Sequence, residues 1–179
     1  MKSLKTIIAV LCLTAMSPTV QAQKFGVKAG LNFANVTGND FGDTKARTGF
    51  HVGVFKEITL VPELLFLVPE AQYSSQGFKS GDKDYSIDYV NIPVVAKVYI
   101  LKLFSIEGGV YAGFKVGDNL PGNSGDGLKT LDTGIAAGVG LNFPLGLSVN
   151  ARFMQGVSEI ADNSDAKNQV LQLGAAFKF

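Results

Sequence analysis

The sequence predicts an all-β protein, an eight-stranded antiparallel up-and-down transmembrane β-barrel, from three observations. Apolar side chains recur at every second position in several segments, which is the period of a strand with two unlike faces. Glycine is abundant at 21 residues and phenylalanine at 13, while tryptophan is absent, a composition that suits closely packed strands. The expected connections alternate between short and long, as is typical of membrane barrels.

The N-terminal segment has the pattern of a secretory signal. Lysines precede an apolar run from Ile7 to Met16, and Val20-Gln21-Ala22 supplies small residues for a cleavage site. We therefore expect residues 1–22 to be a cleaved signal peptide and residues 23–179 to form one barrel domain. The apolar run is shorter than the about 20 residues that a membrane-spanning helix needs.

Charge and cysteine content narrow the chemistry of the mature chain. Removing Lys2 and Lys5 changes the formal net charge from +1 to −1, so no basic surplus favours nucleic acid. The one cysteine, Cys12, lies in the expected signal peptide, so we expect no disulfide, no thiolate metal site and no cysteine nucleophile. No cofactor and no metal are predicted.

Eight segments have strand character. They lie at 24–36, 48–58, 62–74, 85–99, 103–116, 131–143, 146–157 and 168–179.

The first two segments place glycine opposite apolar side chains. Segment 24–36 alternates strictly, with Phe25, Val27, Ala29, Leu31 and Phe33 on one face. Segment 48–58 puts Gly49 and Gly53 on the polar face, together with His51. Such faces predict strands that are apolar on one side only.

The next two segments are less regular because each contains a proline. In segment 62–74 the apolar run 64–68 does not alternate, and Pro69 follows it. In segment 85–99 the residues from Val90 to Val98 alternate, but Pro93 lies among them. Since proline lacks a backbone N–H, we expect a bulge or an unpaired position at each.

The last four segments share the pattern of the first. Apolar side chains occupy every second position in 103–116, 131–143 and 146–157, with glycine or polar residues between them. Segment 168–179 ends on an aromatic residue, as the final strand of an outer-membrane barrel typically does when it carries an assembly signal. The expected signal residues are Leu171, Leu173, Phe177 and Phe179.

The expected connections divide into two sets. Those near residues 59–60, 101–102 and 144–145 are short, whereas those after the first, third, fifth and seventh strands are longer, at about 10–14 residues. Membrane barrels have short periplasmic turns and longer outer loops, and an even strand count puts both termini in the periplasm.

The two faces of the strands also distinguish a membrane barrel from a soluble one. The polar face is rich in glycine, and the lumen of an eight-stranded barrel is just wide enough for side chains to fill it. We therefore assign the polar face to the lumen and the aliphatic face to lipid, where a closed barrel satisfies the backbone hydrogen bonds.

Five ordered stretches resemble the PorT-like family of small outer-membrane β-barrel proteins. They are residues 25–32, 62–65, 90–94, 106–113 and 170–174. The resemblance implies eight strands, an outer-membrane location and, for some members, a part in protein secretion or surface maturation. The sequence departs from the family pattern mainly in the loops and at residues 66–72. It brings no catalytic residues.

Charged and polar residues expected in the lumen are candidates for a structural network, because confined charges must pair. A conducting path or a ligand site built from the same groups is the alternative. The candidates are Lys28, His51, Glu63, Lys97, Glu107, Tyr111, Lys115, Asp132, Arg152 and Lys178.

His51 is the sole histidine, so it is the candidate base of a lipid-modifying enzyme. Its neighbours supply no nucleophile, and Ser86 or Ser148 would have to be brought close by the fold. We therefore expect no enzyme. The oxygen-rich stretch 117–127 lacks EF-hand spacing, so it is interpreted as a surface loop rather than a calcium site.

The resulting hypothesis is a Gram-negative outer-membrane barrel with a structural or interaction role, as an accessory to protein secretion or surface assembly. Expected partners are outer-membrane lipid, the barrel-assembly machinery and proteins that contact loops 37–47, 117–130 and 158–167. A small pore for solutes is the main alternative. An outer-membrane lipid-modifying enzyme and a soluble periplasmic lipocalin-like binder are the others.

Overall fold

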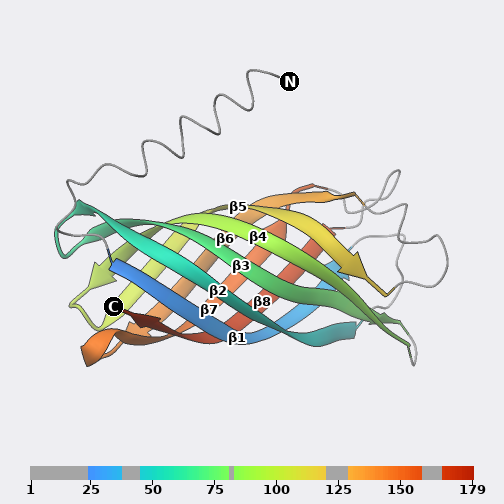
Figure 1. The fold of residues 1–179 in the computed structure, drawn as a ribbon, viewed down its shortest axis with the longest axis horizontal. Helices are drawn as coiled ribbons and strands as arrows, with labels where there is room; N and C mark the ends of the chain where they lie inside the picture. The colour runs from blue at the N-terminus through green and yellow to red at the C-terminus, as the bar shows by residue number, and fades with distance from the viewer. Residues whose placement is uncertain (1–23, 38–44, 81–82, 120–128, 159–166) are drawn as a thin grey trace, which may run out of the picture.

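Eight antiparallel strands close into one barrel in the order β1 to β8, with β8 paired back to β1 (Figure 1). The computed structural model describes residues 24–37, 45–80, 83–119, 129–158 and 167–179. The predicted fold class is therefore confirmed. The elements are β1 (Lys24–Thr37), β2 (Lys45–Val61), β3 (Leu65–Ser80), β4 (Lys83–Ile100), β5 (Phe104–Asp118), β6 (Leu131–Asn142), a 3₁₀ turn η3 (Pro144–Gly146), β7 (Leu147–Gly156) and β8 (Lys167–Lys178).

The barrel has two unlike ends, which we call the turn end and the loop end. At the turn end lie the short β2–β3, β4–β5 and β6–β7 connections, the start of β1 and Phe179 (Figure 1). The backbone N–H of Phe179 donates to the carbonyl of Phe25 at 2.9 Å. The strand ends on either side of the other connections lie at the opposite, loop end. In the part of the chain that is described, no helix is long and apolar enough to cross a membrane.

Two connections differ from the sequence prediction. The β2–β3 turn lies at residues 62–64 rather than 59–60, because β2 stays paired to β3 as far as Val61. The prediction of a long connection after the third strand was wrong, since β3 and β4 pair as far as Ser80 and Lys83. Phe78, Ile87 and Tyr89 form an apolar cluster near the loop end, which buries the extended part of this hairpin.

The prolines leave gaps in the ladders without shifting the register. Between β2 and β3, Phe55 pairs with Glu70 and Ile58 with Leu67, and the two intervening positions on each strand, Pro69 among them, are not paired. Between β3 and β4, the two positions on each strand between the Pro69–Val94 and Gln72–Asn91 pairs, Pro93 among them, are not paired. This agrees with the expected unpaired positions. The bulges lie elsewhere, for example between Asp88 and Tyr89 in the β4–β5 pairing.

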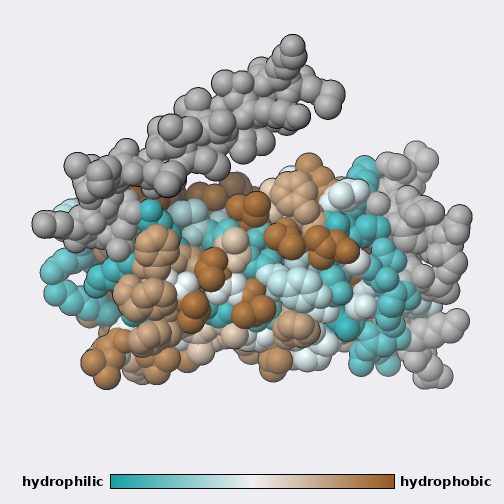
Figure 2. Space-filling model, viewed as in Figure 1, coloured by the Kyte–Doolittle hydropathy of each residue, from teal (hydrophilic) through white to brown (hydrophobic). Residues whose placement is uncertain are grey.

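Apolar side chains cover the outside of the barrel. Val27, Leu31 and Val110 are 46%, 50% and 60% exposed, and brown side chains gather along the middle of the face in Figure 2, with teal ones toward the loop end. A soluble lipocalin-like barrel would place this face inward around its ligand. An apolar exterior around a closed barrel is instead the arrangement that lipid requires.

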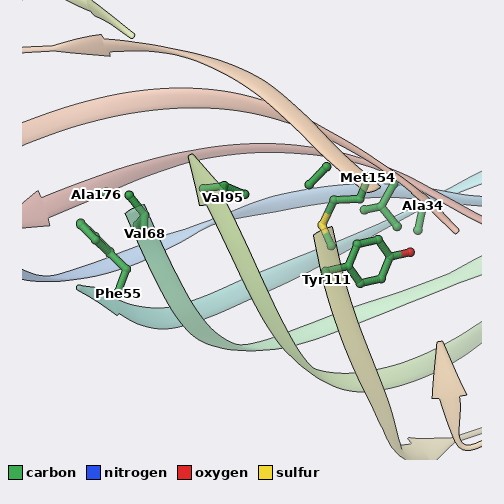
Figure 3. Packing of buried hydrophobic residues seen from close by; sticks show 9 residues of the cluster. Ala34, Phe55, Val68, Val95, Tyr111, Met154 and Ala176 are labelled. Atoms are coloured by element: carbon green, nitrogen blue, oxygen red, sulfur yellow. The ribbon is translucent and has the colours of Figure 1, made fainter. Parts of the chain in front are cut away.

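The lumen is packed with both apolar and polar side chains. Phe55, Val68 and Ala176 lie together in one part of it, while Tyr111 and Met154 lie in another (Figure 3). Several of the larger side chains lie over glycines: a Cβ at Gly138 would come within 2.8 Å of Glu107 Oε1, and one at Gly134 within 2.5 Å of the Tyr111 ring. The glycine-rich face therefore gives the lumen the room that its large side chains occupy.

Candidate functional site

An ion network joins four alternate strands across the lumen. Arg152 on β7 donates to both oxygens of Glu70 on β3, at 2.7 and 2.6 Å, and from Nε to Glu107 on β5 at 2.7 Å. Lys28 on β1 donates to Glu70 at 2.9 Å. The two cations and two carboxylates balance, and their side chains are between 2% and 10% exposed. Such pairing is what keeps buried charges tolerable.

A second charged cluster surrounds Glu57, nearer the turn end. Its carboxylate accepts hydrogen bonds from Tyr99 at 2.6 Å, Lys178 at 2.7 Å and Lys97 at 3.4 Å. Both lysine ammonium groups lie near the Tyr99 ring, 4.9 and 5.1 Å from its centroid. Two lysines therefore share one carboxylate, which leaves a surplus of positive charge in this cluster.

A cavity of about 810 Å³, here the turn-end cavity, opens between these clusters and the short turns. Its deepest lining residues are those of the ion network, and Phe55, Phe66 and Val68 form an apolar wall. Glu63 and Lys102 line its mouth, where their side chains are 3.0 Å apart and largely exposed. Its volume lies in the range of small-molecule pockets.

Uncharged polar side chains fill the lumen on the other side of the ion network. His51 donates from Nδ1 to Asn32 Oδ1 at 2.9 Å, and Gln172 donates to the same oxygen at 3.1 Å. The side-chain amides of Gln72 and Asn91 are buried without a hydrogen-bond partner among the described residues. Buried amides of this kind are commonly satisfied by internal water.

A third layer lies near the loop end, around Asp132. Its carboxylate accepts hydrogen bonds from Asn168 at 3.1 Å, Tyr111 at 3.2 Å and Ser158 at 3.0 Å. The residues come from β5, β6 and β8 and from the second residue after β7. Because Asp132 is 3% exposed, these three donors replace the water that the carboxylate loses.

The structure divides the predicted lumen residues among these groups. It brings Lys28, Glu107 and Arg152 together in the ion network, and Lys97 and Lys178 together around Glu57. Tyr111 and Asp132 form a separate pair, and His51 lies in the amide layer. Lys115 is near the loop end, 3.0 Å from Asp118.

Glu63 does not lie in the lumen, contrary to the sequence prediction. It is at the β2–β3 turn with a positive φ of 62°, and its side chain is 73% exposed. The predicted strand 62–74 begins three residues later, at Leu65. The side chains of β3 that do face the lumen include those of Phe66, Val68, Glu70, Gln72 and Ser74.

Sequence reasoning missed the two carboxylates on which the clusters depend, Glu57 and Glu70. Glu57 lies two positions after Phe55 and six after His51, so the alternation in β2 could have placed it inward. Glu70 directly follows Pro69 and an apolar run, which hide the alternation in β3. Tyr99 shares a face with Lys97, but its contact with Lys178 depends on the pairing of distant strands.

The enzyme hypothesis gains little from the position of His51. The side chain is 1% exposed inside the barrel, away from the lipid-facing surface. Ser86 lies near the start of β4 at the loop end, and Ser148 near the start of β7 at the turn end. The Ser74 hydroxyl, which is opposite His51 in the β2–β3 ladder, instead accepts hydrogen bonds from Asn32 and Gln76.

Some predicted features lie wholly or partly outside the described residues. They include the signal peptide 1–22 and most of loops 37–47, 117–130 and 158–167, with the oxygen-rich stretch among them. Within the described strands and turns, no group of three or more His, Cys, Asp or Glu side chains could hold a metal ion.

The residues of the expected assembly signal lie on the outer surface of β8. Leu171, Leu173 and Phe177 are 40% to 46% exposed, and Phe179 is 70% exposed. The Phe177 and Phe179 rings are 6.4 Å apart between centroids. They form an aromatic patch at the turn end.

Three solved structures similar to this chain are each below 25% identical to it, so they show its fold alone. Ail, the attachment invasion locus protein of Yersinia pestis, has a TM-score of 0.53 and 18% identity over 87% of this chain and 98% of its own. Neisserial surface protein A has a TM-score of 0.59 and 12% identity over 87% and 97%. The outer membrane enzyme PagL has a TM-score of 0.56 and 15% identity over 87% and 99%.

Sequence comparison places the chain in a family. No curated protein matches it. Residues 21–162 match the family model described as outer membrane protein beta-barrel domain, which covers β1 to β7. Together with the closed barrel and its apolar exterior, this match shows that the chain belongs to the outer membrane protein beta-barrel domain family and is an outer-membrane β-barrel protein.

Proposed function

We propose that this protein is a stiff, internally sealed barrel with a structural or interaction role, as an accessory to protein secretion or surface assembly. The ion network of Lys28, Glu70, Glu107 and Arg152 is the observation that carries the proposal. It ties β1, β3, β5 and β7 across the lumen, so the walls cannot separate without breaking buried charge pairs. The accessory role rests on the resemblance to PorT-like proteins.

The positions of the cavity and the polar layers support a lumen that does not conduct. The turn-end cavity extends from the turns to the ion network. Beyond that network lie the amide layer and the Asp132 layer. A pore would need a continuous wet path through all three. No catalytic role is assigned, since buried His51 donates to Asn32.

Several expectations from the sequence complete the proposal. The turn end would face the periplasm, with both termini there, and residues 1–22 would be removed as a signal peptide. Leu171, Leu173, Phe177 and Phe179 would form the signal read by the barrel-assembly machinery. Loops 37–47, 117–130 and 158–167 would offer partner sites on a rigid scaffold.

Planar-bilayer recording tests the sealed lumen. The wild-type protein should give no stepwise conductance, whereas Arg152→Ala, which removes the centre of the ion network, should give measurable leakage if it still folds. A matched control is Arg47→Ala, since Arg47 pairs with Asp84 near the loop end, outside the network. Regular conductance steps from the wild-type protein would contradict the sealed barrel and favour a small pore.

An affinity pull-down from gently solubilised outer membranes tests the accessory role. The tagged protein should recover secretion or surface-assembly components reproducibly, and these should be identified by mass spectrometry. A tagged unrelated eight-stranded barrel of equal abundance is the control for nonspecific recovery. Recovery of the barrel alone would count against an accessory role.

A further inference from the structure

Among the charged side chains that line the turn-end cavity, six cations face four carboxylates. The terminal carboxylate of Phe179, which also lines the cavity, reduces the surplus to one positive charge. In the depth of the cavity, Lys28 and Arg152 are matched by Glu70 and Glu107. At its mouth, Lys102 is matched by Glu63. The imbalance therefore lies between them, in the Glu57 cluster.

Glu57 is 2% exposed and contacts two ammonium groups, those of Lys97 and Lys178. Lys24 also lines the cavity and is paired with Glu57 in the β1–β2 register, so it adds a further positive charge nearby. Because the side chains of Lys97 and Lys178 are only 14% and 21% exposed, water solvates their charges incompletely, which makes the surplus costly. An anion that enters the cavity would relieve this cost.

The cavity offers apolar surface beside these charges. Phe55 and Val68 lie together inside the barrel (Figure 3), and Phe66 packs edge-on against Tyr99 with ring centroids 5.2 Å apart. All four side chains line the cavity. A small inorganic anion would leave this wall unused, whereas an anion with an apolar group would cover both surfaces.

We infer that the turn-end cavity binds a small amphiphilic oxyanion, a carboxylate or phosphate that carries a short apolar group. The oxyanion lies against the ammonium groups of Lys97 and Lys178, and the apolar group lies against Phe55 and Phe66. The ligand enters from the turn end, because the ion network blocks the way from the loop end. This inference goes beyond the proposed structural role, and it holds whether or not the barrel has protein partners.

The first experiment uses the full barrel, labelled with ¹⁵N, in nanodiscs of zwitterionic phosphatidylcholine. Hexanoate, hexyl phosphate, inorganic phosphate and hexylammonium are titrated in turn while the backbone amide signals of Tyr99 and Ser105, both lining residues, are followed. The two amphiphilic anions should give saturable shifts at these amides. Inorganic phosphate should bind at least about tenfold more weakly, and hexylammonium should give no saturable shift.

Three outcomes would overturn the inference. Equal shifts with hexylammonium would show apolar binding without charge recognition, and equal affinity for inorganic phosphate would show a simple anion site. Absence of any saturable shift at the Tyr99 and Ser105 amides would show that the cavity binds neither of the two amphiphilic anions. All three outcomes are measured on the wild-type protein, so the test does not require any substituted protein to fold.

Variants then locate the oxyanion. Lys97→Met should weaken hexanoate binding by about tenfold or more, since it removes an ammonium group and keeps an apolar side chain of similar length. Lys79→Met is the matched control, because Lys79 lies at the loop end of β3, far from the cavity, with a 46% exposed side chain. Unchanged binding in folded Lys97→Met, as judged by heat-modifiable migration, would contradict the assigned position.

A lipid headgroup and a free amphiphile share this chemistry, and a second set of nanodiscs separates the two sources. With anionic phosphatidylglycerol added, a cavity that takes a lipid headgroup should show shifted Tyr99 and Ser105 amides before any titration and weaker hexanoate binding. A cavity that takes free amphiphiles should show the same amide positions and the same hexanoate affinity in both lipids. Either result keeps the oxyanion assignment and names its source.

Discussion

Arg152 on β7 and Glu70 on β3 form a two-pronged contact across the lumen, with hydrogen bonds of 2.7 and 2.6 Å between residues 82 positions apart in the sequence. Both oxygens of the carboxylate accept from one guanidinium, a geometry that is stronger than a single contact. Arg152 also holds Glu107. Arg152 is thus the cation on which two buried carboxylates depend.

Arg152→Met should destabilise the barrel by about 3–5 kcal/mol, the usual cost of breaking a buried ion pair by removing one partner. Two carboxylates, Glu70 and Glu107, would then face the single ammonium of Lys28. The free energy of unfolding in urea, measured for the barrel refolded into lipid vesicles, gives the magnitude.

Adding Glu107→Gln to Arg152→Met should recover part of that loss. The second substitution removes the surplus carboxylate and leaves Glu70 paired with Lys28. The double variant should therefore unfold at higher urea than Arg152→Met alone, which a double-mutant cycle would show as coupling. Losses that simply add would mean that the charges act independently.

Gly109→Ala should destabilise the barrel, whereas Gly108→Ala should not. A Cβ on Gly109 would overlap the carbonyl oxygen of Val94 and come within 2.6 Å of the Val95 Cα, which are backbone atoms of the paired strand β4. A Cβ on the neighbouring Gly108 would meet no atom closer than 3.9 Å. Overpacking of this kind costs about 1–3 kcal/mol, and urea unfolding of both variants compares them directly. Equal stability would show that the strands can separate to make room.

The sequence predicts the lining of the lumen better than its contacts. Alternation along β1, β5 and β7 places Lys28, Glu107 and Arg152 on the polar face, because period two is a local property of a strand. Glu70, which pairs with both Lys28 and Arg152, was not placed on that face, since Pro69 and the apolar run before it obscure the alternation in β3.

The contact between Glu57 and Lys178 is harder still to predict, because the two residues are 121 positions apart. It depends on the register of β1 with both β2 and β8, which pairs Lys24 with Glu57 and Gly26 with Lys178. Alternation gives the face of each residue but not its height in the barrel. The turn-end cavity cannot be predicted from the sequence either, because its lining depends on the heights of residues from different strands.

Leu145→Asn should stabilise the β6–β7 turn by up to about 1 kcal/mol. Leu145 has a φ of 66°, a left-handed conformation that asparagine adopts more readily than a branched apolar residue, and its side chain is 92% exposed. Leu147→Asn is the control, since Leu147 begins β7 with an extended backbone and an outward side chain. A higher midpoint of unfolding for Leu145→Asn, with a lower one for Leu147→Asn, is the expected result. A lower midpoint for both would indicate that the Leu145 side chain itself contributes to stability.

Lysine substitutions on the outer surface test how the barrel lies in the bilayer. Val110 is near the middle of β5 and 60% exposed, and Val116 is near its loop end and 58% exposed. Because the cost of a lysine depends on its depth in lipid, Val110→Lys should lose about 2–4 kcal/mol and Val116→Lys about 0–1 kcal/mol. Reversible unfolding from lipid vesicles measures both losses, and unfolding in detergent micelles should reduce the difference between them. Equal losses in vesicles would mean that the two positions lie at the same depth, and the band centred on the middle of β5 would then not be the part of the barrel that spans the membrane.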